Sequence, residues 1–448
     1  LFVLARLTDI DIRSSLPWPR KVKCAFIFRR DLRLYDNTGL NRALEECEVV
    51  YPLFIIDHRQ MLNNPYKSEF AVAFMVDSLV QLDQELRSLG ARLNVFYGQP
   101  DEVVARLNVN AVYVNEDYTP FSRERDSRIA YACKSTGKEF RSFEDYLLTS
   151  KSVKPPLRFS AFYNRVKDLK VREPEGLVNG DLAEMSSLDV SVLKEFVKVR
   201  SPLFEGGRRE GLKLLRREVD FSRRDYPAER NHTMLSPHIK FGTVSIREAY
   251  YGREEEEFRR ELYWRDYFTL IAYYYPHVFG HTFRPECENI AWENNWDYYY
   301  AWTKGTTGYP IVDAAMRALN ETGFINSRLR MIAAFFLVKV LFVDWRWGEK
   351  YFATKLVDYD PAVNNGNWQW VASTGVDYTF RVFNPWLQQE KFDPQAKFIK
   401  EWVEELKDVP PSRIHKHYLN PVEGYPRPMV DWKERVELVR KAYEMCRQ

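Results

Sequence analysis

The chain has 448 residues, of which 45% are hydrophobic and 29% charged, with a formal net charge of +3. This length predicts two or three domains with real cores, and the near-neutral balance excludes a globally basic nucleic-acid-binding protein, so any basic surface must be local. Aromatic residues make up 15% of the chain, including 12 Trp, which favours stacking surfaces or an electronic role in addition to core packing.

The cysteines and the apolar runs indicate in which compartment the protein works. The five cysteines form no Cys-x-x-Cys pair and predict a cytosolic, disulfide-free protein: Cys24, Cys47, Cys133, Cys287 and Cys446. No apolar run reaches the roughly 18–20 residues that span a bilayer. Charges throughout the first residues argue against a secretion signal, so we expect 1–21 to be a leader or an added segment outside the fold.

Strand and helix patterns alternate in the first third of the chain. The strand-like runs are 22–28, 48–56, 92–96 and 111–115, and the helical patterns are 69–89, 100–107 and 122–136. This alternation predicts a doubly wound, Rossmann-like parallel sheet in an α/β domain over 22–149. Ligands of such sheets lie beyond the carboxyl ends of the strands, here near 28–33, 57–59 and 115–118.

The pattern changes after residue 149. Prolines and glycines across 150–202 predict an interdomain linker without regular elements. From 203 to 448 the patterns are helical and strand signals are nearly absent, which predicts a larger all-α domain.

Residues 358–375 are the most informative stretch. They bring together Asp358, Asp360, Asn364, Trp368 and Trp370. Buried carboxylates and amides are costly unless they are paired, and exposed tryptophans usually mark a site. This mixture is typical of a pocket for a large, flat ligand with polar edges.

A second candidate face lies on the helical pattern around 261–268. Glu261, Trp264, Arg265 and Phe268 share one face of a helix. Either this is a surface salt bridge beside a core aromatic, or Trp264 stacks on a base while Glu261 hydrogen-bonds the edge of that base.

Two arginines open the apolar helix that follows. Arg328 and Arg330 are two residues apart, roughly 200° around a helix, so they serve different purposes. An inward arginine needs a carboxylate, and Asp358 and Asp360 are the candidates. The alternative is that both arginines pair on the surface.

Other signals are weaker taken alone. The turn at 233–242 places small hydroxyls at a helix start, which suits phosphate binding but is equally an ordinary cap. The tryptophans of three further segments are most simply core residues: Trp292, Trp345 and Trp368. Hydrolase and metalloenzyme motifs are missing from the sequence, and no metal site is expected.

Taken together, these segments resemble the DNA photolyase/cryptochrome family, most of all the class I photolyases that act on cyclobutane pyrimidine dimers. The resemblance runs from about 22 to 393 through the motifs at 28–37, 115–120, 233–242, 261–268, 307–317, 328–331 and 358–375. It implies an α/β domain that can hold an antenna chromophore, and a helical domain that buries FAD. The implied activity is that of a carbon–carbon lyase.

Residue roles follow from the resemblance by position. The implied FAD contacts are Thr233, Leu235, Ser236, Arg265, Arg330, Asp358, Asp360 and Asn364, with Asn364 facing the flavin N5. The implied electron relay consists of Trp368, Trp345 and Trp292. The implied DNA and lesion contacts are Glu261, Trp264, Ser327, Arg328, Met331, Trp370, Arg381 and Gln388. Implied antenna contacts are Arg30, Asp31, Asn115 and Glu116, with a deazaflavin or flavin favoured over folate.

The implied reaction is light-driven DNA repair, in which excited, fully reduced FAD donates an electron to a flipped-out pyrimidine dimer. Ser327 departs from the family, since Asn is usual there in dimer photolyases and His in (6-4) photolyases. The rival interpretation is a cryptochrome-type light receptor without repair, but the set Glu261, Trp264, Met331 and Trp370 favours repair. We expect a monomer that binds UV-damaged DNA in the cytoplasm or nucleoid, away from membranes and not secreted.

Overall fold

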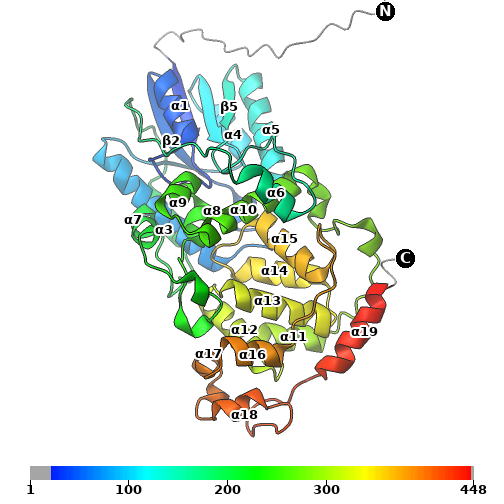
Figure 1. Ribbon diagram of the computed structural model, residues 1–448. Helices are drawn as coiled ribbons and strands as arrows, with labels where there is room; N and C mark the ends of the chain where they lie inside the picture. The colour runs from blue at the N-terminus through cyan, green and yellow to red at the C-terminus, as the bar shows by residue number, and fades with distance from the viewer. Residues whose placement is uncertain (1–21, 445–448) are drawn as a thin grey trace, which may run out of the picture.

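The computed structural model describes residues 22–444, so the expected leader over 1–21 and Cys446 lie outside the described residues (Figure 1). A five-stranded parallel sheet forms the upper part of the molecule, in the order β3-β2-β1-β4-β5. Its strands are β1 (Lys23–Ile27), β2 (Val49–Ile56), β3 (Asn94–Tyr97), β4 (Ala111–Asn115) and β5 (Glu139–Phe143). The predicted parallel α/β domain is therefore confirmed.

Helices cover both faces of this sheet. They are α1 (Thr38–Glu46), α2 (His58–Met61), α3 (Glu69–Ser88), α4 (Pro100–Arg106) and α5 (Pro120–Ser135). Residues of α1 and α3 form one buried cluster with the sheet, and residues of α4 and α5 form another on the other side. Two covered faces explain why the inner strands are continuous apolar runs. The α3 helix follows the predicted pattern, capped by Ser68 and followed by Gly90 at φ 79°.

Sequence patterns missed several elements of this region. The α1 helix is short, and the edge strand β5 is only half-buried, so neither has a strong period. The expectation that 150–202 holds no regular element is wrong, because α6 (Phe159–Val166) and the 3-10 helix η1 (Val190–Phe196) lie within it. Both have apolar faces that pack on neighbouring domains, which local composition does not reveal.

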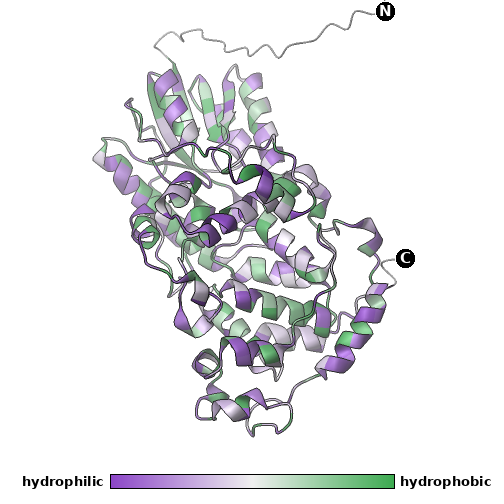
Figure 2. Ribbon diagram, viewed as in Figure 1, coloured by the Kyte–Doolittle hydropathy of each residue, from purple (hydrophilic) through white to green (hydrophobic). Residues whose placement is uncertain are grey.

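The rest of the described chain is helical and contains no further strand, as predicted. Its α-helices are α7 (Arg208–Leu215), α8 (Ser236–Phe241), α9 (Ile246–Gly252), α10 (Glu256–Tyr274), α11 (Trp296–Lys304), α12 (Pro310–Thr322), α13 (Ser327–Phe335), α14 (Trp345–Lys355), α15 (Pro361–Ala372), α16 (Pro385–Phe392), α17 (Lys397–Trp402), α18 (Pro411–His415) and α19 (Trp432–Glu444). Helices α12 to α15 supply much of the largest buried cluster. Hydrophobic and hydrophilic residues alternate along the helices, as one-sided burial requires (Figure 2). None of the helices between residues 22 and 444 has both the length and the apolar character needed to cross a membrane.

A disulfide links Cys24 in β1 to Cys47 at the end of α1. The Cα atoms are 6.1 Å apart, within the usual range for a bridge. The expectation of a disulfide-free protein is therefore wrong. The two cysteines are 23 residues apart and share no motif, so only the packing of α1 on the sheet brings them together.

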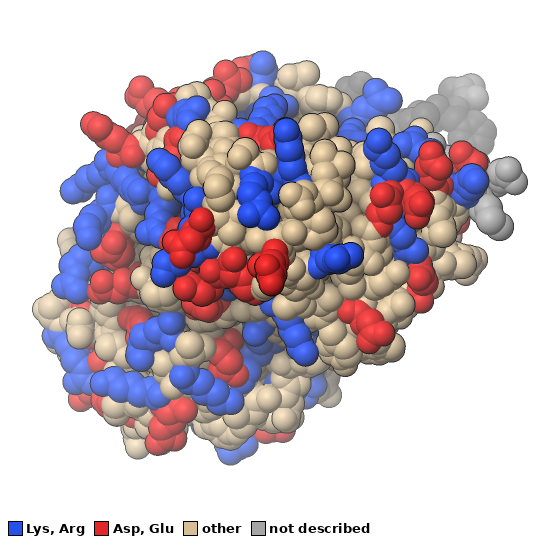
Figure 3. All heavy atoms as spheres, turned by 90° about the horizontal axis from the view of Figure 1, so that it is seen from below, with Lys and Arg blue, Asp and Glu red and all other residues tan. Residues whose placement is uncertain are grey.

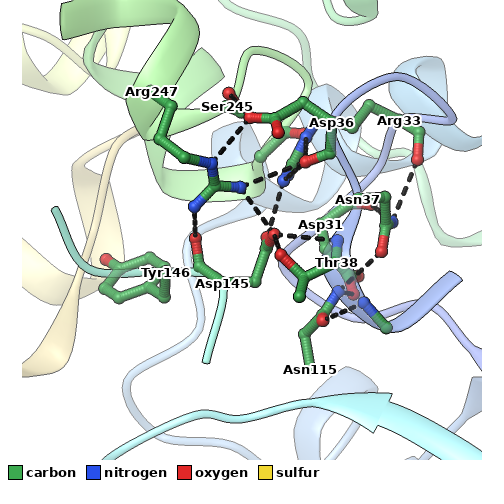
Figure 4. Close-up of polar contacts among 12 residues, drawn as sticks. Asp31, Arg33, Asp36, Asn37, Thr38, Asn115, Asp145, Tyr146, Ser245 and Arg247 are labelled. Atoms are coloured by element: carbon green, nitrogen blue, oxygen red, sulfur yellow. Dashed lines mark hydrogen bonds and ion pairs between the residues drawn. The ribbon is translucent and has the colours of Figure 1, made fainter. Parts of the chain in front are cut away.

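A buried polar network joins the α/β domain to the helical domain (Figure 4). Arg247 of α9 donates to the carboxylates of Asp36, which precedes α1, and Asp145, which follows β5. Arg33 donates to the other oxygen of Asp145 at 2.6 Å, and Ser245 donates to Asp36. Burial alone would raise the pKa of Asp145, but the guanidinium groups of Arg33 and Arg247 hold it well below its usual range. The two domains are thus joined by buried ion pairs.

Candidate functional site

One face of α15 carries the polar and aromatic residues that drew attention to 358–375. Asp360, Asn364 and Trp368 are four residues apart, so they follow one another along this face. All three are buried, and Trp368 is only 2% exposed. Asp360 is the N-cap, and its Oδ1 accepts from the backbone N–H groups of Ala362 and Val363 at 3.0 and 3.2 Å.

Two residues of the α/β domain complete the environment of Asp360. The Asp360 carboxylate accepts hydrogen bonds from the guanidinium of Arg30 and from the phenol of Tyr146. Burial alone would raise the pKa of Asp360, but Arg30 and Tyr146 hold it well below its usual range. Arg265 of α10 lies over the Tyr146 ring at 3.4 Å and donates to the Tyr146 carbonyl at 2.6 Å. The cap of α15 is therefore an anionic point surrounded by cations.

Further along α15, two amides meet a buried carboxyl group. Asn364 Nδ2 donates to the backbone oxygen of Glu349 at 3.0 Å, and Asn365 Nδ2 donates to Glu349 Oε2 at 2.7 Å. Burial raises the pKa of Glu349 to about 7. These bonds fix the orientation of α15 against α14.

The two arginines of α13 have separate partners. Arg330 Nη2 lies 2.8 Å from Asp358 Oδ2, which is the pairing predicted for an inward arginine. Arg328 instead pairs with Asp225 at 2.9 Å and lies over the Phe392 ring at 4.4 Å. Arg330 therefore pairs with a buried carboxylate, whereas both members of the Arg328–Asp225 pair are partly exposed to solvent.

Cations gather where α8 approaches this site. Lys240 of α8 is desolvated and lies beside Arg30, and these two effects lower its pKa to about 7. Arg265 Nε is buried without a hydrogen-bond partner among the described residues. Thr233 Oγ1 accepts from the N–H of Leu235, which is buried, and Ser236 is exposed at the start of α8. An anion placed here would relieve both the repulsion and the unsatisfied donor.

The α10 face is split between solvent and core. Glu261 is half-exposed and pairs with Arg224 at 3.1 Å. Trp264 stacks on Phe159 of α6 with ring centroids 3.6 Å apart, and on Phe268 at 5.4 Å. One face of this indole is therefore already covered by the segment expected to be a plain linker.

The residues implied for DNA and lesion contact also come from α13, the last turns of α15, the segment that follows it, and α16. The Arg381 guanidinium lies 5.1 Å from the centre of the Trp370 ring and pairs with Asp377 at 2.8 Å. Met331 and Trp370 are partly buried against the main core, and Gln388 Oε1 is buried without a partner among the described residues. Ser327 is exposed at the start of α13.

The tryptophans Trp345 and Trp292 occupy neighbouring segments. Trp345 is fully buried on α14, and a Cβ on Gly348, one turn later on the same face, would overlap the ring of Trp368. The backbone of the Trp292 segment is bonded to the segment preceding Trp345, through Glu293 N to Phe342 O at 3.1 Å. Trp368, Trp345 and Trp292 therefore lie in adjoining elements.

The residues expected at an antenna site are engaged within the protein. Asp31 is 3% exposed and accepts from Asn115 Nδ2 at 2.7 Å, and Asn115 Oδ1 accepts from Gly39 N at 2.8 Å. Glu116 pairs with Lys151 at 2.6 Å, and Arg30 bonds to Asp360 and Tyr146. In this structure these polar groups stabilise the carboxyl ends of the inner strands β1 and β4 and the domain boundary.

Surface charge is mixed on the face shown in Figure 3, where basic and acidic side chains are interspersed. This agrees with the near-neutral total and locates no single extended basic field on that face. Among the described residues, no group of three or more His, Cys, Asp or Glu side chains is placed to hold a metal ion.

Sequence patterns did not reveal four residues that shape this site: Arg30 as a partner of Asp360, Tyr146, Lys240 and Glu349. Most of them act through a contact far along the chain, such as Arg30 with Asp360 across 330 residues. The only local signal is the run of charges Arg29-Arg30-Asp31 directly after a strand. From the sequence that run is interpreted as part of an antenna-chromophore site, and not as a partner of Asp360.

Comparisons with known proteins agree with this architecture. A family model described as DNA photolyase matches residues 24–176, and one described as the FAD binding domain of DNA photolyase matches 258–445. A deoxyribodipyrimidine photo-lyase of Synechococcus is 33% identical over 94% of this chain and 96% of its own length.

Solved structures extend the comparison. An archaeal photolyase from Sulfolobus tokodaii, solved with two FAD molecules, is 66% identical, with a TM-score of 0.93 over 94% of this chain and 99% of its own. A class III photolyase from Agrobacterium tumefaciens is 29% identical, with a TM-score of 0.86 over 98% and 99%.

Proposed function

This chain belongs to the DNA photolyase family, and we propose that it uses blue or near-UV light to split cyclobutane pyrimidine dimers in UV-damaged DNA. The observation that supports this proposal best is the α15 face, where a capping carboxylate, an amide and an indole follow one another at four-residue spacing. The face is buried, and α10, α13 and α14 surround it. Such a face suits a flat ligand that needs polar contacts at one edge and an electron donor near the other.

The residues present fit FAD. The flavin nucleotide carries a pyrophosphate, and the donors available for such an anion are Arg265 with its unpartnered Nε, Lys240 near the end of α8, and Thr233 before its start. We propose that Asp358, held by Arg330, and Asp360 contact the ribityl and adenine parts, while Asn364 faces the reactive nitrogen. When bound in its reduced form, FAD supplies a photoexcitable one-electron donor.

The protein's own task is to place the lesion against that donor. We propose that Glu261 and Trp264 hold an edge and a face of the flipped dimer, with Met331 and Trp370 as apolar walls. Arg328 and Arg381 then contact DNA phosphates, which positions the strand without reading its sequence. Both arginines are already held by carboxylates, Asp225 and Asp377, so they are oriented before DNA arrives.

The class of photolyase is part of the proposal. Met331 and Trp370 favour a class I dimer photolyase, although a class III enzyme shares the fold. Ser327 cannot supply the amide usual in the class, and the neighbouring Asn326 cannot replace it, because its Oδ1 caps α13 and its Nδ2 donates to Arg224 O at 3.2 Å. We therefore expect one lesion contact fewer than in a typical class I enzyme.

We further propose that Trp292, Trp345 and Trp368 relay electrons from the surface, supported by their adjoining elements. A second chromophore in the α/β domain, a flavin in preference to a folate, is supported by the Sulfolobus tokodaii structure with its two FAD molecules. Absorption beyond one FAD equivalent in native preparations would support the second chromophore. A clean one-FAD spectrum would count against it. A monomeric, cytoplasmic or nucleoid-associated protein remains our expectation.

The test of the main proposal is direct. Purified protein with reduced FAD is mixed with an oligonucleotide that contains one cyclobutane dimer, and dimers are counted after blue light and after darkness. The proposal predicts loss of dimers only in the light. FAD bound without any loss of dimers would contradict repair and favour a cryptochrome-type receptor.

A further inference from the structure

A continuous series of aromatic rings leads from Trp368 to the protein surface along α11. The Trp368 ring lies 6.2 Å from Trp302, which is fully buried. Trp302 lies 6.3 Å from Tyr299, and Tyr299 lies 6.0 Å from Trp296, each measured between ring centroids. Trp296, Tyr299 and Trp302 are three residues apart, so they form a row on one face of the helix.

Helix α14 supports this row with rings of its own. Trp347 lies 4.4 Å from Trp296 and 5.2 Å from Tyr299, and Tyr351, one turn later, lies 5.5 Å from Trp302. Each step of the row is therefore flanked by a second aromatic ring. Between Trp296 and Trp302 the path does not depend on a single contact.

Core packing explains only part of this arrangement. Trp302 has every feature of a core residue, but Trp296 is 56% exposed at the outer end of the row. Leaving a large apolar ring in water is costly. Burial of apolar surface therefore does not explain why an exposed tryptophan, Trp296, stands at the end of a buried aromatic series. The exposed end needs a different explanation.

The hydrogen bonds of the row give it a direction. Trp302 Nε1 donates to the Ala333 carbonyl at 2.9 Å, and an amide oxygen is too weak a base to remove the indole proton. An oxidised Trp302 would keep that proton and take an electron from its neighbour. Trp296 faces water, which can accept its proton and so hold the oxidised state at the surface. The Tyr299 ring lies between the two indoles and bridges them without being oxidised itself, so its phenol proton stays in place.

We propose that Trp302, Tyr299 and Trp296 form a second electron-entry route to Trp368, separate from the Trp345 and Trp292 segments. This rests on the proposed function, in which light drives one electron from Trp368 to oxidised flavin. In each event one electron leaves Trp296 and fills the vacancy on Trp368, the Trp296 indole releases its N–H proton to water, and a thiol reductant in solution returns one electron and one proton. Two events, with two protons from water, give fully reduced FAD.

The experiment uses the full chain with oxidised FAD and a thiol, and follows the loss of oxidised-flavin absorbance under blue light. Trp345→Phe removes the other route and is the background for two double variants, Trp345→Phe with Trp296→Phe and Trp345→Phe with Trp302→Phe. We expect the single variant to retain photoreduction and each double variant to lose at least about tenfold in rate. Trp345→Phe with Trp402→Phe, a partly buried tryptophan outside both routes, is the matched control.

A second measurement separates electron transfer from folding. Transient absorption should show a deprotonated tryptophan radical in Trp345→Phe, and this signal should disappear when Trp296→Phe is added, with the FAD content of all variants equal. Complete loss of photoreduction in Trp345→Phe alone, or no further loss in the double variants, would overturn the second route while leaving repair intact. A wild-type protein that binds no FAD, or binds it without photoreduction, would instead contradict the proposed function.

Discussion

Arg247 Nη2 lies 2.7 Å from Asp145 Oδ1, across the boundary between the helical and α/β domains. The same guanidinium reaches Asp36 Oδ2 through Nε at 2.8 Å, and all three side chains are at most 5% exposed. Arg247 therefore bridges two buried carboxylates, Asp36 before α1 and Asp145 after β5, and Arg33 supplies a second cation to Asp145. Buried pairs of this kind add little when whole, but breaking one leaves a bare charge in the interior.

Removing this arginine should be strongly destabilising. We expect Arg247→Met to lower the free energy of unfolding by about 3–5 kcal/mol, because Asp36 and Asp145 each lose a partner. Urea denaturation monitored by fluorescence measures the change. Arg42→Met is the control, since the Arg42–Glu45 pair is about half exposed on both sides and such pairs contribute about 0–1 kcal/mol. Equal effects of the two substitutions would show that the network does not join the domains.

The contact between α15 and α10 depends on a glycine. A Cβ on Gly366 would overlap the ring of Phe268, so Gly366→Ala should push the two helices apart. We expect a loss of about 1–3 kcal/mol in unfolding free energy, despite the better helix propensity of alanine, together with lower FAD content. Gly176→Ala, where an added Cβ meets nothing within 4 Å, controls for the substitution itself. A more stable Gly366→Ala protein would mean that propensity outweighs packing here.

Glu349 should make stability fall as pH rises. Burial raises its pKa to about 7, so the folded protein binds this proton more tightly than the unfolded chain. Its stabilisation is complete below the unfolded pKa of about 4.3 and is lost as pH rises through about 7. We expect Glu349→Gln, which keeps an acceptor for Asn365, to gain stability relative to wild type between pH 5 and pH 8. Urea midpoints at both pH values test this, with the exposed Glu423→Gln as control. The same pH slope in Glu349→Gln and wild type would refute the assignment.

Glu261 should matter for the lesion and not for the cofactor. We expect Glu261→Ala to weaken binding of dimer-containing DNA by at least about tenfold, because a hydrogen bond to a charged group contributes about 1.5–3 kcal/mol. FAD content, read from absorbance, should not change. Glu257→Ala, one turn earlier on α10 and also exposed, is the matched control. A loss of FAD in Glu261→Ala would place this residue in the cofactor site instead.

Local patterns predicted the strands and the long helices because each has a strong period, as α3 does. They also predicted that Arg330 pairs with a carboxylate such as Asp358, since an inward charge must find its opposite. They failed where a contact depends on the fold itself. Three contacts are of this kind: the Cys24–Cys47 bond, the Arg30–Asp360 pair and the Trp302–Trp368 contact. Each joins segments that lie apart in the chain, and no local pattern in the sequence shows that they meet.

The Arg30–Asp360 pair also limits how this protein can change over evolution. The cap of α15 takes its cation and its phenol from the α/β domain, so the helical domain does not carry a complete site by itself. A recombination event that exchanged the α/β domain for one lacking Arg30 or Tyr146 would remove the guanidinium or the phenol that bonds the carboxylate at the start of α15. The α15 cap and the segment after β1 therefore depend on each other, although 330 residues separate Arg30 from Asp360 in the chain.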